Sequence, residues 1–264
     1  MSDPDAYRTK REWLPVSNIK ATVPRAAPFK EEPKRSIHVY GDGIGRVDLV
    51  EHMGSDLTIV NSARVSFGKH KEALDEKDER LINYLVKHRH TSTFEHNVVT
   101  FRFAVPLFVR SQHHRHRTWS YNEISRRYTP LNIQFYEPEA FRTQHKSNRQ
   151  ASNADELISP QIEWDRTTAQ QAVNQHHKKS LALFNTLIEA GVCREQARGV
   201  LPQNMYTEYY GTVNLNNLLK FIDLRTHEGA QWEIQKVAEA CLEIAEGLWP
   251  VAVGAYRRAK NESR

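Results

Sequence analysis

The sequence has little cysteine and no long apolar run. Its two cysteines, Cys193 and Cys241, form neither a CxxC pair nor a pattern of Cys and His metal ligands, so neither a disulfide framework nor a zinc site is indicated. No run approaches the ~18 apolar residues of a membrane span. The initial MSDPDAYRTK carries acids and lacks the apolar centre of a secretory signal. We therefore expect a cytoplasmic protein without membrane segments.

The excess of one charge sign over the other is also small. The 37 Lys and Arg and 32 Asp and Glu give a net charge of 37 − 32 = +5. Residues 1–35 hold eight basic and five acidic residues, which leaves 5 − 3 = +2 for the rest of the chain. Nonspecific nucleic-acid binding requires many cations on one face, so this balance argues against a nucleic-acid partner.

What is present is a basic segment, residues 110–130, with the sequence RSQHHRHRTWSYNEISRRYTP. It places five arginines and three histidines around one acid, Glu123, and interleaves them with serine, asparagine and aromatic residues. A core does not accept so many guanidinium groups without partners, and a disordered basic tail lacks such aromatics. Arginine grips phosphate or carboxylate with a planar pair of donors. Composition alone leaves three interpretations open: a small-molecule phosphate site, a nucleic-acid surface and a structural arginine network.

Two other segments are typical of ligand sites without completing the pattern. Residues 41–45, GDGIG, approach a dinucleotide fingerprint, but Arg46 stands where the next glycine is required, so a hairpin turn is predicted. A second segment holds three candidate metal ligands: His90, Glu95 and His96. Their order is not HExxH, and no further ligand of matching spacing stands out.

The segment from Arg115 resembles the signature of one enzyme family. Its register is RHR-x2-S-x-N-E-x-S-x-R-Y, with the residues Arg115-His116-Arg117, Ser120, Asn122-Glu123, Ser125 and Arg127-Tyr128. This is similar to the RHR-x7-S motif of the flavin-dependent (alternative) thymidylate synthases of the ThyX type. The segments 63–67 (ARVSF), 90–96 (HTSTFEH) and 198–202 (RGVLP) also resemble that family. The resemblance covers residues 36 to 256.

The resemblance implies methylation of dUMP at uracil C5 to give dTMP. Methylenetetrahydrofolate would supply the carbon and reduced FAD the hydride, while NADPH would recharge the flavin. The implied fold is α+β, with a curved, mainly antiparallel sheet and packed helices, and the implied assembly is a homotetramer. We expect residues 1–35 to form an extended N-terminal arm and residues 36–260 a single catalytic domain.

The resemblance also implies roles for individual residues. The catalytic residues would be Arg225, at the pyrimidine ring, and His90, beside the flavin. The substrate-binding set would be Gln112, Glu123, Ser125, Arg127, Arg198 and Arg225. The cofactor-binding set would be Ser92, Glu95, Arg115, His116, Arg117 and Asn214, with no metal.

Nucleophilic catalysis by serine or cysteine is not indicated. Ser125 is assigned to binding, because a serine nucleophile needs a positioned base and an oxyanion hole and the sequence shows neither. Thymidylate synthases with a cysteine nucleophile have proline before it. Here Cys193 follows Val192 and Cys241 follows Ala240.

The sequence departs from the family pattern at several positions. Lys220 stands where a neutral or histidine side chain would be expected near the flavin, and His113-His114 replace bulky apolar residues. Two rival functions also remain. A nucleic-acid-binding module would use the same arginines and contain no flavin. A metal-dependent hydrolase would use His90, Glu95, His96 and His116 and contain a metal.

Hydrophobic periodicity predicts the elements that carry these residues. A strand over 97–105 should point Val99, Phe101, Phe103 and Val105 into the core, and residues 206–213 should form a strand or an extended turn. Helices are predicted over 72–89, 107–116, 163–190 and 215–225, and from Gln231 to a kink or end at Pro250. Residues 139–160 are predicted to be a polar insertion loop, and residues 176–179 the solvated side of their helix.

Overall fold

In a computed structural model, the structure describes residues 36–125, 133–162 and 166–262. Residues 1–35, the expected arm, and Arg127, an expected phosphate ligand, lie outside the described residues. Across the described ranges, none of the helices combines the length and apolar character that crossing a bilayer requires.

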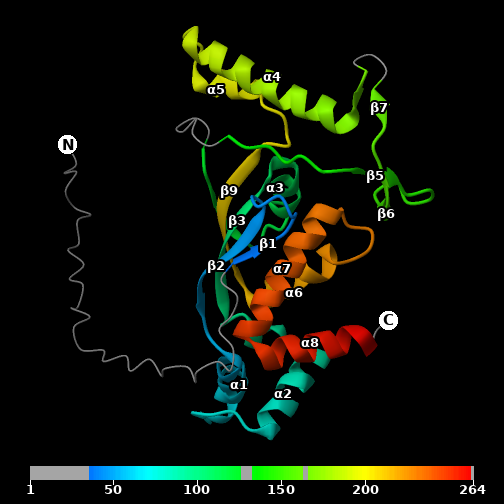
Figure 1. Ribbon diagram of the computed structural model, residues 1–264. Coiled ribbons are helices and arrows are strands. Elements are labelled where there is room, and N and C mark those ends of the chain that lie inside the picture. The colour runs from blue at the N-terminus through cyan, green and yellow to red at the C-terminus, as the bar shows by residue number, and fades with distance from the viewer. Residues whose placement is uncertain (1–35, 126–132, 163–165, 263–264) are drawn as a thin grey trace, which may run out of the picture.

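A five-stranded antiparallel sheet forms the centre of the molecule (Figure 1). In sheet order its strands are β1 (Ser36–His38), β2 (Arg46–Met53), β3 (Val98–Pro106), β9 (Tyr206–Asn214) and β4 (Ser120–Glu123). The long central pair runs in register from Val98 opposite Asn214 to Pro106 opposite Tyr206. The predicted core face of β3 is confirmed, since its residues Val99, Phe101, Phe103 and Val105 are buried.

Helices cover this core face. The core cluster joins the buried residues of β3 to those of α6 (Leu215–Arg225) and α7 (Trp232–Leu248), which lie beside the sheet in Figure 1. At one end of the molecule, α8 (Pro250–Glu262) packs on α1 (Asp56–Arg64) and α2 (Glu76–Lys87). At the other end lie α4 (Ala169–Glu189) and α5 (Arg194–Ala197). The α+β class with an antiparallel sheet is therefore confirmed.

Short elements complete the chain. The 3-10 helices are η1 (Val65–Phe67), η2 (Thr91–Phe94) and η3 (Arg198–Val200), and the short helix α3 (Leu107–His113) follows β3 directly. Two small hairpins pair β5 (Phe141–Gln144) with β6 (Ser152–Ile158), and β7 (Gln161–Ile162) with β8 (Thr167–Thr168). The GDGIG segment is the predicted hairpin turn between β1 and β2, with Gly41 at φ 76° and Gly43 at φ 71°.

Several predicted elements need correction. The helix expected from residue 72 begins at Glu76, because the Asp75 side chain accepts hydrogen bonds from the Lys77 and Asp78 amides and ends the preceding loop. The helix expected over 107–116 ends at His113. Residues 139–160 are not a loop, since they contain the β5–β6 hairpin.

The long helix α4 also differs from the prediction. It begins at Ala169, where Thr168 caps it, and not at residue 163. Residues 176–179 do not all lie on a solvated side. His177 is buried, stacks on Phe135 with ring centroids 4.6 Å apart, and bonds Glu137 at 2.8 Å.

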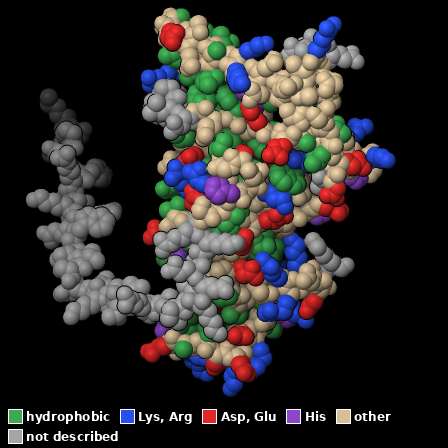
Figure 2. All heavy atoms as spheres, viewed as in Figure 1, with side chains coloured by type: hydrophobic (Ala, Val, Ile, Leu, Met, Phe, Trp, Pro, Cys, Tyr) green, Lys and Arg blue, Asp and Glu red, His purple; other side chains and the backbone are tan. Residues whose placement is uncertain are grey.

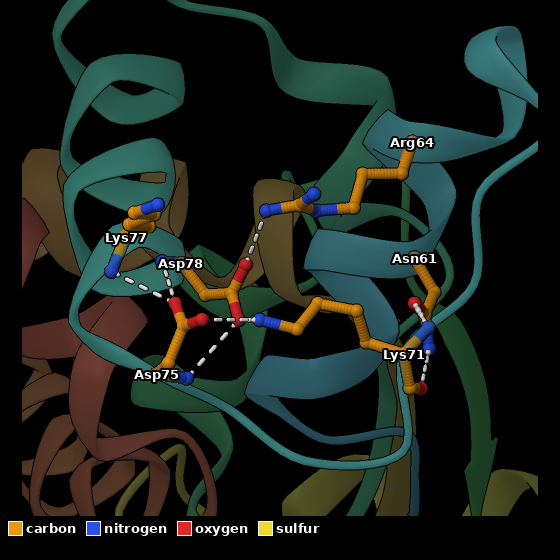
Figure 3. A network of polar contacts seen from close by, with 6 residues as sticks. All are labelled: Asn61, Arg64, Lys71, Asp75, Lys77 and Asp78. Carbon is orange, nitrogen blue, oxygen red and sulfur yellow. Dashed lines mark hydrogen bonds and ion pairs between the residues drawn. The ribbon is translucent and has the colours of Figure 1, made fainter.

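A polar network ties α1 to α2 (Figure 3). Its centre is Asp78, which is fully buried and accepts from Arg64 Nη2 at 2.5 Å, from Lys71 Nζ and from the Asp75 amide at 3.0 Å. The Asn61 side chain donates to the Lys71 carbonyl and accepts from the Lys71 amide, each at 2.9 Å. Burial alone would raise the pKa of Asp78, but Lys71, the Asp75 amide and Arg64 together hold this pKa below its ordinary value.

This network predicts a large stability loss on neutralising Asp78. Asp78→Asn keeps the shape but removes the charge that Arg64 and Lys71 share, so the free energy of unfolding should fall by about 3 kcal/mol. Urea unfolding measures the change. The matched control is Glu76→Gln in the same helix, whose exposed carboxylate lies 3.8 Å from Arg80 and whose loss should leave the unfolding midpoint in place. Equal effects of the two substitutions would contradict the role given to Asp78.

Candidate functional site

Three of the predicted site residues meet in one cluster: Arg225, His116 and Gln112. Arg225 is the last residue of α6, and its Nε donates to Nε2 of His116 at 3.0 Å. Its Nη2 donates to the main-chain oxygen of Gln112 at 3.3 Å. Residues more than 100 positions apart in the sequence are therefore joined by the guanidinium group.

Local structure places each member of this cluster. Asn214 accepts from the Asn217 amide at 2.9 Å and so caps the start of α6, whose final turn then carries Arg225. On the other side, the chain turns sharply after α3. The Tyr121 hydroxyl holds this turn by donating toward the carbonyls of His113 at 2.9 Å and His116 at 3.1 Å.

His113, one of the departures from the family pattern, lies behind the cluster in an aromatic cage. It is fully buried, and its ring centroid lies 4.5 Å from that of Trp119, 4.6 Å from Phe221 and 4.8 Å from Phe103. Its Nδ1 bonds the Tyr209 hydroxyl at 2.8 Å, while its Nε2 has no partner among the described residues. Burial, followed by the nearby charges, keeps the pKa of His113 well below 6.5, so the ring is neutral and fills an apolar position.

The electrostatics of the cluster suit an electron-rich ligand. Partial burial, reinforced by Arg225, lowers the pKa of His116 to about 4, so His116 is neutral and can accept from Arg225. Burial and the charge of Arg115 also lower the pKa of Arg225. The two described partners of Arg225 are a neutral ring nitrogen and a carbonyl. Its positive charge is therefore available to a carbonyl or anionic oxygen of a ligand.

A second group of predicted residues lies at the other end of α6. Glu95, just after η2, accepts from the Asn216 side chain at 2.8 Å, which places it beside the helix start at Asn214. Ser92 and His90 are exposed on the same segment. Sequence reasoning missed Tyr84, an exposed residue of α2 whose ring stacks on that of His90 with centroids 5.8 Å apart.

The remaining predicted residues are spread more widely. Glu123 accepts from Arg110 Nε at 3.1 Å and from the Thr207 hydroxyl at 2.7 Å, which couples α3 to β9. Arg198 is exposed in η3, against α4 and α5, and among the described residues no hydrogen bond or ion pair joins it to Arg225. Ser125 ends a described range, and Arg115 and Arg117 are exposed.

The chemistry of these residues is compatible with a flavin. A flavin offers amide-like ring edges and a diphosphate. Ser92, Glu95 and Asn214 lie near the start of α6, and Arg115 is an exposed cation whose charge acts on Arg225 at its end. Arg117 is exposed two residues further along the chain. The His113–His114 departure does not remove any of these groups, because His113 faces the core.

Sequence reasoning also missed two side chains behind Gln112. Gln231 accepts from Nε2 of Gln112 and donates its own Nε2 to Glu233 at 2.9 Å. The sequence marked Gln231 as the start of a helix, and nothing in its spacing indicated a contact with residue 112, which lies 119 positions earlier.

The buried His113 predicts a loss of stability in acid. An unfolded chain binds a proton at histidine near pH 6.5, whereas the folded chain keeps His113 neutral to much lower pH. The stabilisation that comes from a neutral, buried His113 is complete above about pH 6.5, and it decreases as the pH falls toward the lower pKa of the folded state. We expect His113→Phe, which keeps a ring in the cage, to show a smaller fall in the urea midpoint between about pH 8 and about pH 5. An equal fall in both proteins would contradict this assignment.

Comparison with known proteins identifies the family. The thymidylate synthase complementing protein model matches residues 48–251. A flavin-dependent thymidylate synthase of Thermus thermophilus is 46% identical over 212 residues, which cover 80% of this chain and 75% of that protein. The enzyme of the same name from Rickettsia bellii is 37% identical over 247 residues, covering 90% and 82%.

A solved structure is similar as well. The UMP/dUMP methylase PolB of Streptomyces cacaoi, bound with 5-Br dUMP, superimposes with a TM-score of 0.71 at 32% identity, covering 84% of this chain and 97% of that one. Fold, motif and sequence similarity agree over most of the chain. The chain therefore belongs to the thymidylate synthase complementing protein family, the flavin-dependent thymidylate synthases.

Proposed function

We propose that this protein is a flavin-dependent thymidylate synthase that methylates dUMP at C5 to give dTMP. Methylenetetrahydrofolate is the carbon donor, and NADPH is the reductant that acts through FAD. The observation that carries the proposal is the Arg225–His116–Gln112 cluster, which lies at the RHR motif of a chain that belongs to this family.

Arg225 is proposed to hold a carbonyl oxygen of the uracil ring. Methylation at C5 requires electron density to move into the ring, and negative charge then develops on this oxygen. The guanidinium is half-buried and bonded to neutral acceptors, so its charge acts in a less polar environment than water. His116 fixes the plane of the guanidinium by accepting from Nε, and it can do so because it is neutral.

The phosphate is proposed to bind Gln112, Ser125, Arg127 and Arg198, with Glu123 orienting neighbouring groups. Arg198 lies in the α4–α5 end of the fold and is exposed, so it is available to a nucleotide held by another copy of the chain. From the family to which the chain belongs, we infer a homotetramer whose active sites draw on more than one subunit. A single catalytic domain over residues 36–260 and a curved sheet complete the proposal.

FAD is proposed to bind Ser92, Glu95, Arg115, His116, Arg117 and Asn214, with His90 beside its ring. When bound, the flavin supplies the hydride of the reaction. The residues along α6 orient the two ligands, because one helix carries Asn214 at its start and Arg225 at its end. Lys220 is exposed on the same helix and adds a cation to this surface.

The rival functions have less support. On the face drawn in Figure 2, basic and acidic side chains are intermingled and do not form the one-sign surface that a polynucleotide requires. In the described part of the chain, His, Cys, Asp and Glu form no group of three suited to a metal ion.

The decisive experiment is the absorption spectrum of the purified full-length protein. Two flavin bands should be present, or should appear after FAD is added, and NADPH should bleach them in the absence of air. Addition of dUMP and methylenetetrahydrofolate should then yield dTMP. A protein that takes up no FAD and forms no dTMP would overturn the proposal and favour the nucleic-acid alternative.

Arg225 provides a test by substitution. Arg225→Lys keeps the charge but loses the paired donors to His116 and Gln112, so kcat/KM for dUMP should fall by a factor of roughly 10² to 10³. Steady-state dTMP formation measures the change. Arg257→Lys is the control, because Arg257 is paired to Glu246 at 2.7 Å on the surface. A similar loss of kcat/KM in the two variants would contradict the role given to Arg225 at the uracil ring.

A further inference from the structure

We propose that Glu233 and Gln231 are positioning residues that fix the side-chain orientation of Gln112 at the nucleotide site, and that Arg142 holds Glu233 in place. The inference rests on the proposed function, because it takes Gln112 to contact dUMP. It extends the site to a side-chain relay that runs from α3 through the start of α7 to the β5–β6 hairpin.

The relay is a continuous chain of hydrogen bonds. Gln112 Nε2 donates to Gln231 Oε1, and Gln231 Nε2 donates to Glu233 Oε2 at 2.9 Å. The other carboxylate oxygen, Oε1 of Glu233, accepts from Arg142 Nη2 at 2.6 Å and from the Tyr136 hydroxyl at 3.2 Å. The Glu233 side chain is only 4% exposed, so its carboxylate lies away from water.

The carboxylate gives the relay one direction. An ionised carboxylate only accepts hydrogen bonds, whereas an amide side chain can both donate and accept. Gln231 must therefore turn its nitrogen toward Glu233, which leaves its oxygen toward Gln112. Gln112 must in turn direct its nitrogen to Gln231. Its carbonyl oxygen and its second N–H then keep a single orientation toward the ligand.

Arg142 holds the Glu233 end of the relay in place. Its guanidinium lies over the Trp232 ring, 5.1 Å from the ring centroid, and its Nε donates to Ser152 at 3.0 Å. A buried carboxylate loses its hydration, and an arginine that bonds it directly offsets part of that loss. Arg142 comes from β5, so a hairpin in the segment that the sequence indicated as an insertion reaches the nucleotide site through two side chains.

A structural role and a positioning role make different predictions. If Glu233 only stabilises the fold, its replacement lowers the unfolding midpoint. It then weakens dUMP and FAD binding by the same factor whether or not the Gln112 side chain is present. If it orients Gln112, its replacement weakens dUMP binding only while the Gln112 side chain is present. A double-mutant cycle separates these cases.

The test compares the FAD-loaded full-length protein with Glu233→Gln, Gln112→Ala and the double variant. Glu233→Gln is close to isosteric but removes the acceptor-only end of the relay. We expect it to raise the Kd for dUMP about tenfold in the unchanged background and less than about twofold in the Gln112→Ala background. Its KM for dUMP should rise more than its kcat falls, and FAD affinity should stay the same.

Arg142 supplies the second arm and a matched control. Arg142→Ala should raise the Kd for dUMP in the same way, whereas Arg142→Lys should recover part of the affinity. Thr143→Val on the same strand removes a hydroxyl that bonds Glu156 at 2.7 Å, and it should leave dUMP binding unchanged. A comparable loss in Thr143→Val would show that disturbance of the hairpin, and not the relay, lowers affinity.

The outcomes distinguish the relay from the underlying assignment. If Gln112→Ala weakens dUMP binding but the effects of the two substitutions add, the relay is wrong and the nucleotide site stands. If Gln112→Ala binds dUMP as tightly as the unchanged protein, the placement of Gln112 in the site is wrong, and the relay fails with it.

Discussion

The hydrogen bond from Arg225 to a neutral His116 is the contact on which the arrangement of the site depends. A protonated imidazole could not accept from the guanidinium, so the low pKa of His116 is a condition of the cluster. The condition is met by packing. The turn that carries His116 lies against α6, where the rings of His116 and Phe221 pack at nearly right angles with centroids 4.9 Å apart. Burial of His116 among apolar side chains thus keeps its ring neutral and able to accept the hydrogen bond from Arg225.

The same packing explains why the site can be both polar and rigid. His113, Trp119 and Tyr121 pack on the buried rings of Phe103 in β3 and Tyr209 in β9. The Tyr121 hydroxyl also bonds two carbonyls of the turn. The turn that carries the exposed arginines Arg115 and Arg117 is therefore held in a fixed conformation. Packing of aromatic rings behind this basic segment offsets the repulsion among its positive charges.

The sequence predicted those parts of the fold that depend on local pattern. Alternation in β3 identified its core face, and Asn214 marked the start of α6, because both signals reside in neighbouring residues. The β5–β6 hairpin was missed because its two strands are polar and show no apolar alternation. The burial of His177 was missed because its partner, Glu137, lies 40 positions away in the sequence. The family resemblance named Arg225, His116 and Gln112 as site residues, and the structure joins these three by hydrogen bonds, while their roles stay predictions. Gln231 and Glu233 could not be found, since only the packing of α7 on α3 places them there.

Helix α6 fixes the distance between the two groups of site residues, one near Asn214 at its start and one around Arg225 at its end. Its eleven residues span about 16 Å at about 1.5 Å per residue, which sets the separation between the groups near Asn214 and the guanidinium of Arg225. The helix also sets their relative direction. One residue added within it would lengthen this spacing only slightly but would rotate Arg225 by about 100° away from His116. Variation in the length of this helix is therefore far less tolerable than variation in the loops on either side.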